Sequence, residues 1–114
     1  MKASRDVIVY GASGYTGKLV AWKLAENNIP FVAAGRNQAR LEEQMASVTE
    51  LEGRDYICTE VAHDVTALRE LFSGAKVVYN VVGPFMQYGE PVVQAALDAG
   101  CHYLDSTGEQ DWMI

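Results

Sequence analysis

Apolar and polar positions along the chain follow two alternating periods. Short runs rich in β-branched residues, typical of strands covered on both faces, alternate with stretches in which apolar residues recur every three or four positions, typical of helices with one buried face. The predicted strands span residues 6–10, 31–34, 56–61, 76–82 and 102–105. The predicted helices span residues 16–27, 38–48, 68–72 and 91–99.

The last predicted helix lies between Pro91 and Gly100. Proline is favoured in the first turn of a helix and glycine just beyond its last residue, so these two residues are expected to mark its ends. Apolar residues fall on nearly every side of this segment, which predicts a well-buried helix.

The regular alternation of strand and helix predicts a doubly wound, Rossmann-type α/β fold, in which right-handed crossovers join parallel strands. We expect a sheet of at least five strands in the order 3-2-1-4-5. Residues 1–114 should form one domain. Residues 109–114 lead into what looks like a further element, which predicts the N-terminal part of a longer, two-domain protein.

Three glycines come directly after the first strand and open the first helix. They lie in the segment Gly11-Ala-Ser-Gly14-Tyr-Thr-Gly17. Glycines in this position allow a tight turn, a close approach of the backbone to a pyrophosphate, and close packing of the helix whose N-terminal N–H groups face the anion. We expect Gly11 to form the turn, Gly14 to lie nearest the phosphates and Gly17 to pack the helix against the sheet. The alternative is a glycine-rich connection that binds nothing.

Ser13, Tyr15 and Thr16 complete the predicted diphosphate site. The hydroxyl groups of Ser13 and Thr16 can donate hydrogen bonds to phosphate oxygens. Either side chain could instead cap the helix that follows, which is an equally good use of a hydroxyl group at this point of the chain.

The end of the second strand distinguishes NADP from NAD. Domains that bind NAD place an acidic residue there, about 20 residues beyond the glycines, to hold the ribose hydroxyls. This chain instead has Ala34-Gly-Arg36-Asn37. A guanidinium group can bind a 2′-phosphate that a carboxylate would repel, which predicts NADP, with Arg36 on the phosphate and Asn37 both capping its helix and touching the phosphate. Arg36 could alternatively be a solvated surface residue, and Arg40 is a second candidate.

Two segments further along complete the candidate site. Asp64 and Val65 follow the third strand, where an acid can meet the adenine amino group; an Asx turn or a helix cap is the alternative. The residues after the fourth strand lie across the switch point from the glycines, where the nicotinamide ribose would pass. A Gly-Pro turn that ends the strand is the alternative for this second segment. Its candidate residues are Val82, Gly83, Pro84 and Phe85.

Composition excludes several other classes of protein. Fifteen acidic residues against nine basic ones give a net charge of −6, which argues against a nucleic-acid partner. No apolar run approaches the roughly 20 residues of a membrane span. Cys58 and Cys101 lack CxxC spacing and are expected to be buried, reduced thiols. Without a basic and then apolar leader, the expected location is the cytoplasm.

Other catalytic and metal-binding patterns are missing. His63 and His102 have no companions at metal-ligand spacing, so no metal site is expected. None of the six tyrosines has a lysine four residues later, which argues against a self-contained short-chain reductase. The Gly-x-Ser-x-Gly turn of α/β-hydrolases is also missing.

Five short blocks carry a family resemblance. They span residues 11–17, 34–37, 80–85, 88–92 and 103–109, and the Gly-Pro-Phe and Thr-Gly-Glu sequences within them are the most specific. Together they resemble the nucleotide-binding domain of saccharopine dehydrogenase-like oxidoreductases, which include trans-acting enoyl reductases. The resemblance implies that the glycines and Arg36 bind NADP and that residues 83–85 line the nicotinamide side. It also implies a second domain that closes the substrate site.

These observations predict the NADP-binding domain of an oxidoreductase, which positions the nicotinamide for hydride transfer and is inactive alone. Its partners would be the dinucleotide and, in the full-length protein, a small-molecule substrate; a homo-oligomer is compatible with this function. No catalytic residue is assigned. Two alternatives remain: a non-catalytic, NADP-sensing regulatory domain, and a fragment of an atypical short-chain reductase or epimerase.

Overall fold

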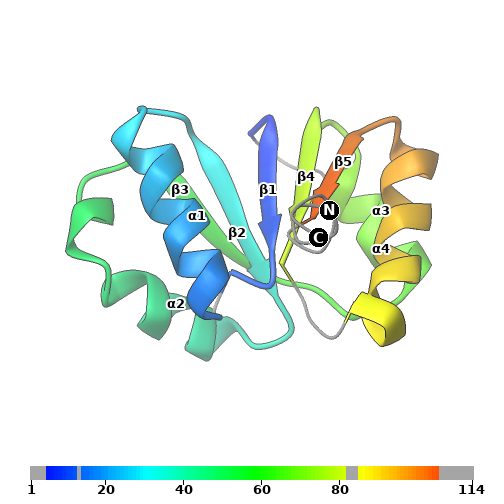
Figure 1. Ribbon diagram of the computed structural model, residues 1–114, viewed down its shortest axis with the longest axis horizontal. Helices are drawn as coiled ribbons and strands as arrows, with labels where there is room; N and C mark the ends of the chain where they lie inside the picture. Colours follow the sequence, from blue (N-terminus) through cyan, green and yellow to red (C-terminus); the bar gives the residue numbers. More distant parts are fainter. Residues whose placement is uncertain (1–4, 13, 82–84, 106–114) are drawn as a thin grey trace, which may run out of the picture.

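A five-stranded parallel sheet forms the centre of the computed structural model, which describes residues 5–12, 14–81 and 85–105 (Figure 1). The strand order is β3-β2-β1-β4-β5, which confirms the predicted fold class and order. The strands are β1 (Val7–Tyr10), β2 (Phe31–Gly35), β3 (Tyr56–Glu60), β4 (Val77–Asn80) and β5 (His102–Asp105). The helices are α1 (Tyr15–Glu26), α2 (Gln38–Ala46), the short 3-10 helix η1 (Thr49–Leu51), α3 (Val65–Phe72) and α4 (Phe85–Ala99).

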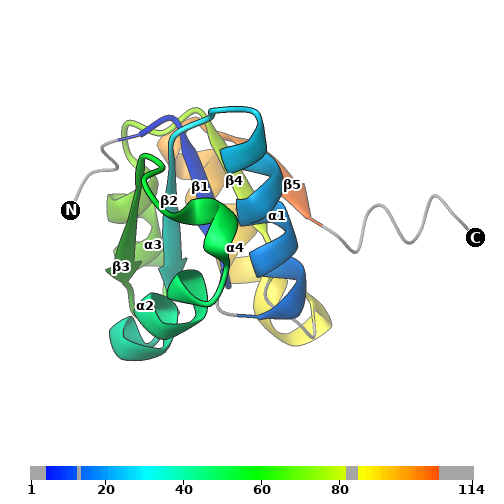
Figure 2. The same cartoon turned by 90° about the vertical axis from the view of Figure 1, so that its left-hand side faces the viewer.

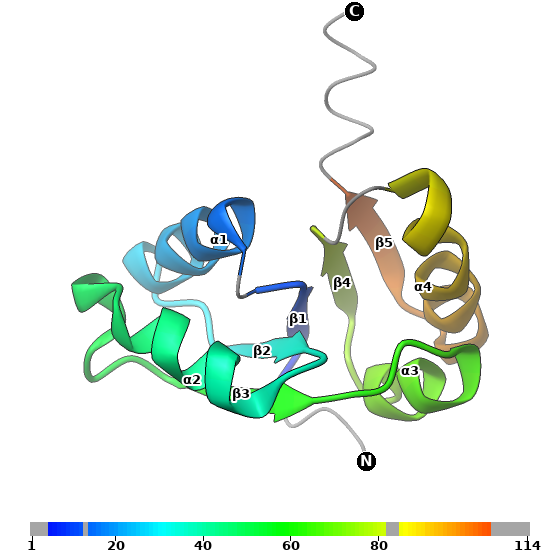
Figure 3. The same ribbon diagram turned by 90° about the horizontal axis from the view of Figure 1, so that it is seen from below.

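Helices cover the sheet on both faces. Helices α1 and α2 lie on one face, and α3 and α4 lie on the other (Figure 3). Right-handed crossovers require this division, because the chain moves from β1 outward to β3 and then returns to add β4 and β5 on the opposite side of β1. The strand order therefore reverses between β1 and β4, at whose carboxyl ends ligands of doubly wound sheets bind.

Two apolar clusters, one on each face of the sheet, form the core. Successive side chains of a strand point to opposite faces. In β1, Val9 accordingly packs with Phe31 and Leu41 beside α1 and α2, while Ile8 and Tyr10 pack in the cluster of α3 and α4. Because both faces are covered, β1 and β2 read as nearly continuous apolar runs in the sequence.

Helix α4 differs from its prediction. It begins at Phe85 rather than near Pro91, which lies inside the helix. A proline in the interior of a helix removes one backbone hydrogen bond, and the fully buried Val92, Ala95 and Ala96 show that packing holds this helix in place nevertheless. The helix is also not buried on every side, since Leu97 is 64% exposed.

The other helices are shifted at their ends only. Helix α2 stops at Ala46, and η1 follows it, so the predicted extension to Val48 is wrong. Helix α3 begins at Val65, earlier than expected, because Asp64 caps it. Across the described residues, every helix falls short of the length and apolar character that a bilayer crossing requires.

The two thiols are free, as predicted, but they are buried to different extents. The Cys101 thiol is buried and donates to the carbonyl oxygens of Phe72 and Ala75, at 3.3 and 3.2 Å. Cys58 in β3 is only partly buried. Burial raises the pKa of both thiols, so neither side chain has the character of a reactive thiolate.

Strands β5 and β3 form the two edges of the sheet. On β5, Leu104 is 52% exposed. Strand β3 lies beside α2 at the opposite edge (Figure 2).

Candidate cofactor-binding site

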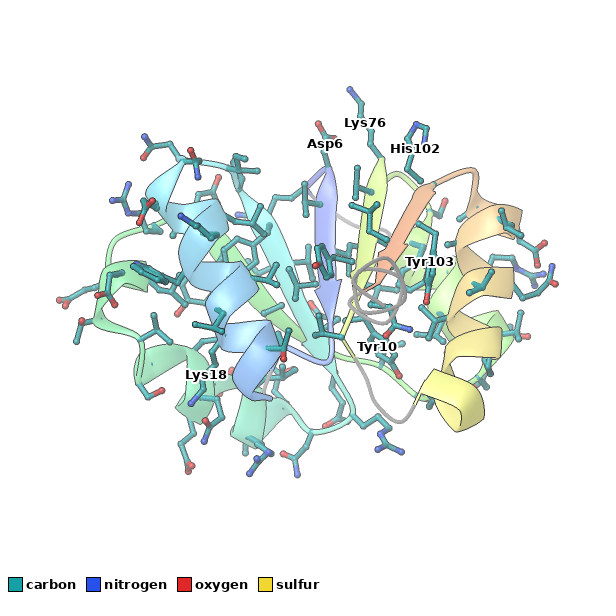
Figure 4. The ribbon with its side chains drawn as sticks, in the orientation of Figure 1. Asp6, Tyr10, Lys18, Lys76, His102 and Tyr103 are labelled. Carbon is teal, nitrogen blue, oxygen red and sulfur yellow. The ribbon has the colours of Figure 1, made fainter. Side chains whose placement is uncertain are left out.

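Three helices begin at the same edge of the sheet, where β1, β2 and β3 end (Figure 3). The labelled side chains give the orientation: Tyr10 marks this carboxyl edge, and Asp6, Lys76 and His102 mark the opposite edge (Figure 4). The first N–H groups of a helix have no carbonyl partner within it, and they carry the positive end of the helix dipole. The three corners are therefore the places where an anion can be bound.

The corner between β1 and α1 is built from glycine backbone. Gly11 has a φ of 90°, in the left-handed region that glycine adopts without strain. Its N–H donates to the carbonyl oxygen of Ala34 in β2 at 2.8 Å, and its own carbonyl accepts from the N–H of Gly14 at 3.2 Å. Gly11 thus forms the turn, and its N–H attaches the turn to the sheet.

Gly17 brings α1 against this turn. A Cβ atom at Gly17 would lie 2.6 Å from the carbonyl oxygen of Gly11 and 2.6 Å from the Cα atom of Ala12, closer than real Cβ atoms come. A Cβ atom at the exposed Gly14 would meet only the carbonyl oxygen of Gly11, at an ordinary 3.7 Å. Gly17 therefore allows close packing, and Gly14 leaves space outside the turn that a side chain would fill.

Helix α1 begins without a side-chain cap among the residues that the structure describes. Its N-cap residue is Gly14, which has extended backbone and no side chain to offer. Thr16 lies exposed in the first turn of α1 and does not cap it, so capping is not its role. Ser13, for which the same question was open, lies outside the described residues.

The corner between β2 and α2 differs because a side chain closes it. The Asn37 side chain accepts from the N–H of Arg40 at 3.0 Å, as the capping prediction required. Arg36 is exposed between the buried end of β2 and this cap, and Arg40 is exposed in the first turn of α2. The position where NAD-binding domains carry an acid thus presents Arg36, and Arg40 follows in the first turn of α2.

The corner between β3 and α3 is also closed by its own residue. The Asp64 carboxylate accepts from the N–H of Ala67 at 2.9 Å, so the helix-cap interpretation of Asp64 is confirmed. Val65 is partly buried and packs against the core. A contact of Asp64 with adenine remains a prediction, and the carboxylate has a second oxygen with which to make it.

A buried tyrosine connects the end of β1 to the segment that follows β3. The Tyr10 hydroxyl lies 2.6 Å from Nδ1 of His63, and the two rings stack with centroids 5.7 Å apart. Burial raises the pKa of Tyr10 to about 12, while Arg36 lowers it and Asp64 raises it further. Tyr10 is the last residue of β1 and His63 follows β3, so this contact holds the ends of the two strands together.

The end of β4 lies beside Tyr10. Asn80, the register partner of Tyr10, is fully buried and donates to the Tyr103 hydroxyl at 2.9 Å. Phe85 and Tyr15 are the first residues of α4 and α1. Three other candidates for the nicotinamide side, Val82, Gly83 and Pro84, lie outside the described residues.

The geometry fits a dinucleotide. A helix start beside a glycine turn, capped by none of the side chains that the structure describes, offers N–H groups to a diphosphate. The space at Gly14 is one that a side chain would fill. A parallel doubly wound sheet with this corner after its first strand defines the class of dinucleotide-binding domains.

Residues 7–113 match the family described as the saccharopine dehydrogenase NADP binding domain, and the chain belongs to this family. The predicted family and cofactor, NADP, are thereby confirmed.

Relatives in other organisms carry related names. A plant relative from Arabidopsis thaliana, named "Probable mitochondrial saccharopine dehydrogenase-like oxidoreductase", is 38% identical over 119 residues. A nematode relative from Caenorhabditis elegans, named "Lipid droplet localized protein", is 37% identical over 116 residues. Each alignment covers 95% of this chain, but the chain spans only 26% and 27% of these relatives' length.

The names of these relatives contradict one expectation. They are described as mitochondrial and as localized to lipid droplets, so the prediction of a cytoplasmic protein is wrong. The prediction failed because the sequence features on which it rested bear on secretion only and do not specify a compartment.

A solved structure shows the same fold. An NADPH-dependent quinone oxidoreductase from Escherichia coli, complexed with NADPH, superimposes with a TM-score of 0.64 at 21% identity. The match covers 83% of this chain and 34% of that one.

Proposed function

We propose that this chain is the cofactor-binding part of a longer, two-domain oxidoreductase and that it holds NADP so that the nicotinamide faces the substrate. The single observation that carries the proposal is the start of α1 beside the glycine turn, which no described side chain caps. Bound NADPH would supply a hydride to the substrate. The chain's own residues bind and orient the dinucleotide, and the rest of the protein would bind the substrate.

Each part of the dinucleotide has candidate partners. Backbone N–H groups at the start of α1, with Ser13, Tyr15 and Thr16 beside them, would hold the diphosphate. Arg36 and Asn37 would hold the 2′-phosphate, because a guanidinium group binds phosphate through two parallel hydrogen bonds. Asp64 and Val65 would meet the adenine, and Val82, Gly83, Pro84 and Phe85 would line the nicotinamide side.

The test is a calorimetric titration of the purified chain with NADPH and NADH. NADPH should bind well ahead of NADH, because only NADPH carries the 2′-phosphate. The variant Arg36→Ala should weaken NADPH binding by about 1.5 to 3 kcal/mol, the value of a charge-assisted contact, and leave NADH binding nearly unchanged.

A matched control is Arg54→Ala. Arg54 is also exposed, but it donates to Asn28 at the opposite edge of the sheet, where β2 and β3 begin. This variant should bind both cofactors as the unmodified chain does. Equal affinity of the unmodified chain for NADPH and NADH would remove Arg36 from its proposed role.

A further inference from the structure

The Gln38 side chain forms hydrogen bonds with the outer edge of strand β3. Its Nε2 atom donates to the carbonyl oxygen of Cys58 at 2.9 Å, and its Oε1 atom accepts from the N–H of Glu60 at 2.9 Å. A residue of a neighbouring parallel strand would bond the same two backbone groups, one on either side of Thr59. The amide of Gln38 thus takes the place of a peptide unit and attaches the start of α2 to β3. The two elements lie beside each other in Figure 2.

Glu60 completes this attachment from the opposite direction. Its Oε1 atom accepts from the backbone N–H of Gln38, the first residue of α2, at 2.9 Å. A carboxylate at this end of a helix is also favoured by the helix dipole. Gln38 and Glu60 are therefore joined by two reciprocal hydrogen bonds, each from the backbone of one residue to the side chain of the other.

These bonds fix the short segment that carries the proposed 2′-phosphate contacts. Only Arg36 and Asn37 separate Gly35, the last residue of β2, from Gln38. Gly35 is anchored because its carbonyl oxygen accepts from the N–H of Val61 at 2.8 Å. Both ends of the segment are thus held against the end of β3, and the direction in which Arg36 leaves the sheet is set before any ligand arrives.

We propose that Gln38 and Glu60 are positioning residues that set the preference for NADP over NAD, because their reciprocal hydrogen bonds hold the backbone of Arg36 and Asn37 in place for the 2′-phosphate. The inference rests on the proposed role of Arg36. A segment that is already ordered loses less conformational entropy when it binds, so the attachment strengthens binding of the ligand that uses Arg36. NAD lacks the 2′-phosphate and gains nothing from it.

The variant Gln38→Met tests the inference, because methionine keeps the length and helix propensity of glutamine but cannot make the hydrogen bonds. NADPH should bind about fivefold more weakly, as expected for the net loss of a hydrogen-bonded anchor. NADH binding should not change, so the ratio of the two affinities falls by the same factor. Gln38→Ala should show the same fall, with the thermal midpoint measured for both variants.

Two further variants serve as controls. Glu60→Gln keeps an oxygen that accepts from the N–H of Gln38, so the preference for NADPH should be retained. Gln44→Ala removes a glutamine from the same helix that bonds its neighbour Glu43, and it should leave both affinities unchanged.

The possible outcomes separate this inference from the proposed function. If Arg36→Ala abolishes the preference and both Gln38 variants retain it, the positioning role is overturned and the proposed function stands. If Arg36→Ala retains the preference, the proposed 2′-phosphate contact fails first. Equal weakening of NADPH and NADH in both Gln38 variants would show a merely structural role and would also overturn the inference.

Discussion

The starts of α1 and α2 lie at the same edge of one sheet, yet they treat their free N–H groups in opposite ways. At α2, and equally at α3, the chain supplies its own acceptor, from Asn37 and Asp64. At α1 the N-cap residue is Gly14, and the residues that the structure describes supply no side-chain acceptor for the first N–H groups. At each of these helix starts the fold presents N–H groups that can bind an anion. The identity of the N-cap residue decides whether a side chain of the protein occupies them.

The largest effect is expected from Gly14→Val, which tests whether the start of α1 binds the diphosphate. The side chain would fill the space beside the free N–H groups, and both NADPH and NADH should lose at least about 3 kcal/mol of binding, the value of two charge-assisted hydrogen bonds. Stability should change by less than about 0.5 kcal/mol, since the backbone of Gly14 is extended and a Cβ atom there meets only one ordinary contact. Calorimetry and thermal unfolding measure the two effects separately.

The contrasting substitution is Gly17→Val. Here the added atoms would overlap the backbone of Gly11 and Ala12, so we expect a loss of about 1 to 3 kcal/mol in the free energy of unfolding. A Gly14→Val variant that binds either cofactor normally would contradict the proposed diphosphate site.

Gly14→Asp would give the start of α1 a side-chain cap like those at the starts of α2 and α3. An aspartate can cap the helix, so the ligand-free domain should gain a few tenths of a kcal/mol in stability. The same carboxylate would repel the diphosphate, and both cofactors should bind about 2 kcal/mol more weakly. A gain in stability without a loss of binding would separate the cap from the cofactor site.

A substitution at Asn37 removes an existing helix cap. Asn37→Ala should lower the free energy of unfolding by about 1 kcal/mol, because the N–H of Arg40 loses its partner. Asn37→Ser should restore most of the loss, since serine caps nearly as well. Chemical denaturation of the ligand-free chain measures both variants, and equal stability of the two would show that the cap is unimportant.

At neutral pH the smallest effect is expected from the Tyr10 hydroxyl group, whose contribution to stability changes only at high pH. The pKa of Tyr10 is raised from 10.0 to about 12, so the folded chain keeps a proton that the unfolded chain loses. The stabilisation is complete below pH 10 and is lost as the pH rises from 10 to 12. The unfolding free energy of the unmodified chain should therefore fall more steeply in this interval than that of Tyr10→Phe. Parallel slopes would contradict the shift.

Most of the fold could be predicted from the sequence because the buried strands are short, apolar and separated by turn residues. It was misleading at Pro91, where a rule about the first turn of helices was applied to a proline that the packing of Val92, Ala95 and Ala96 tolerates in the interior. Helix ends depend on contacts made elsewhere in the chain, and a single sequence does not contain those contacts.

The residues of the candidate site likewise fall into two groups: those that a sequence pattern indicates and those that only the folded chain brings together. The glycines and Arg36 could be proposed as site residues from the sequence because their positions relative to two strands carry the signal. Gln38 and Glu60 were missed because they meet only once the register of β2 and β3 is fixed. Tyr10 and His63 were missed for the same reason, since 53 residues separate the two partners of one hydrogen bond.

The open side of β5 has a practical consequence for work with the domain. Its outer backbone groups have no partner strand among the described residues, and Leu104 adds apolar surface beside them. Unpaired strands of this kind recruit identical strands from other molecules, so concentrated preparations should form dimers or larger species. A lysine introduced by Leu104→Lys would discourage that association, and light scattering at rising protein concentration would reveal the difference.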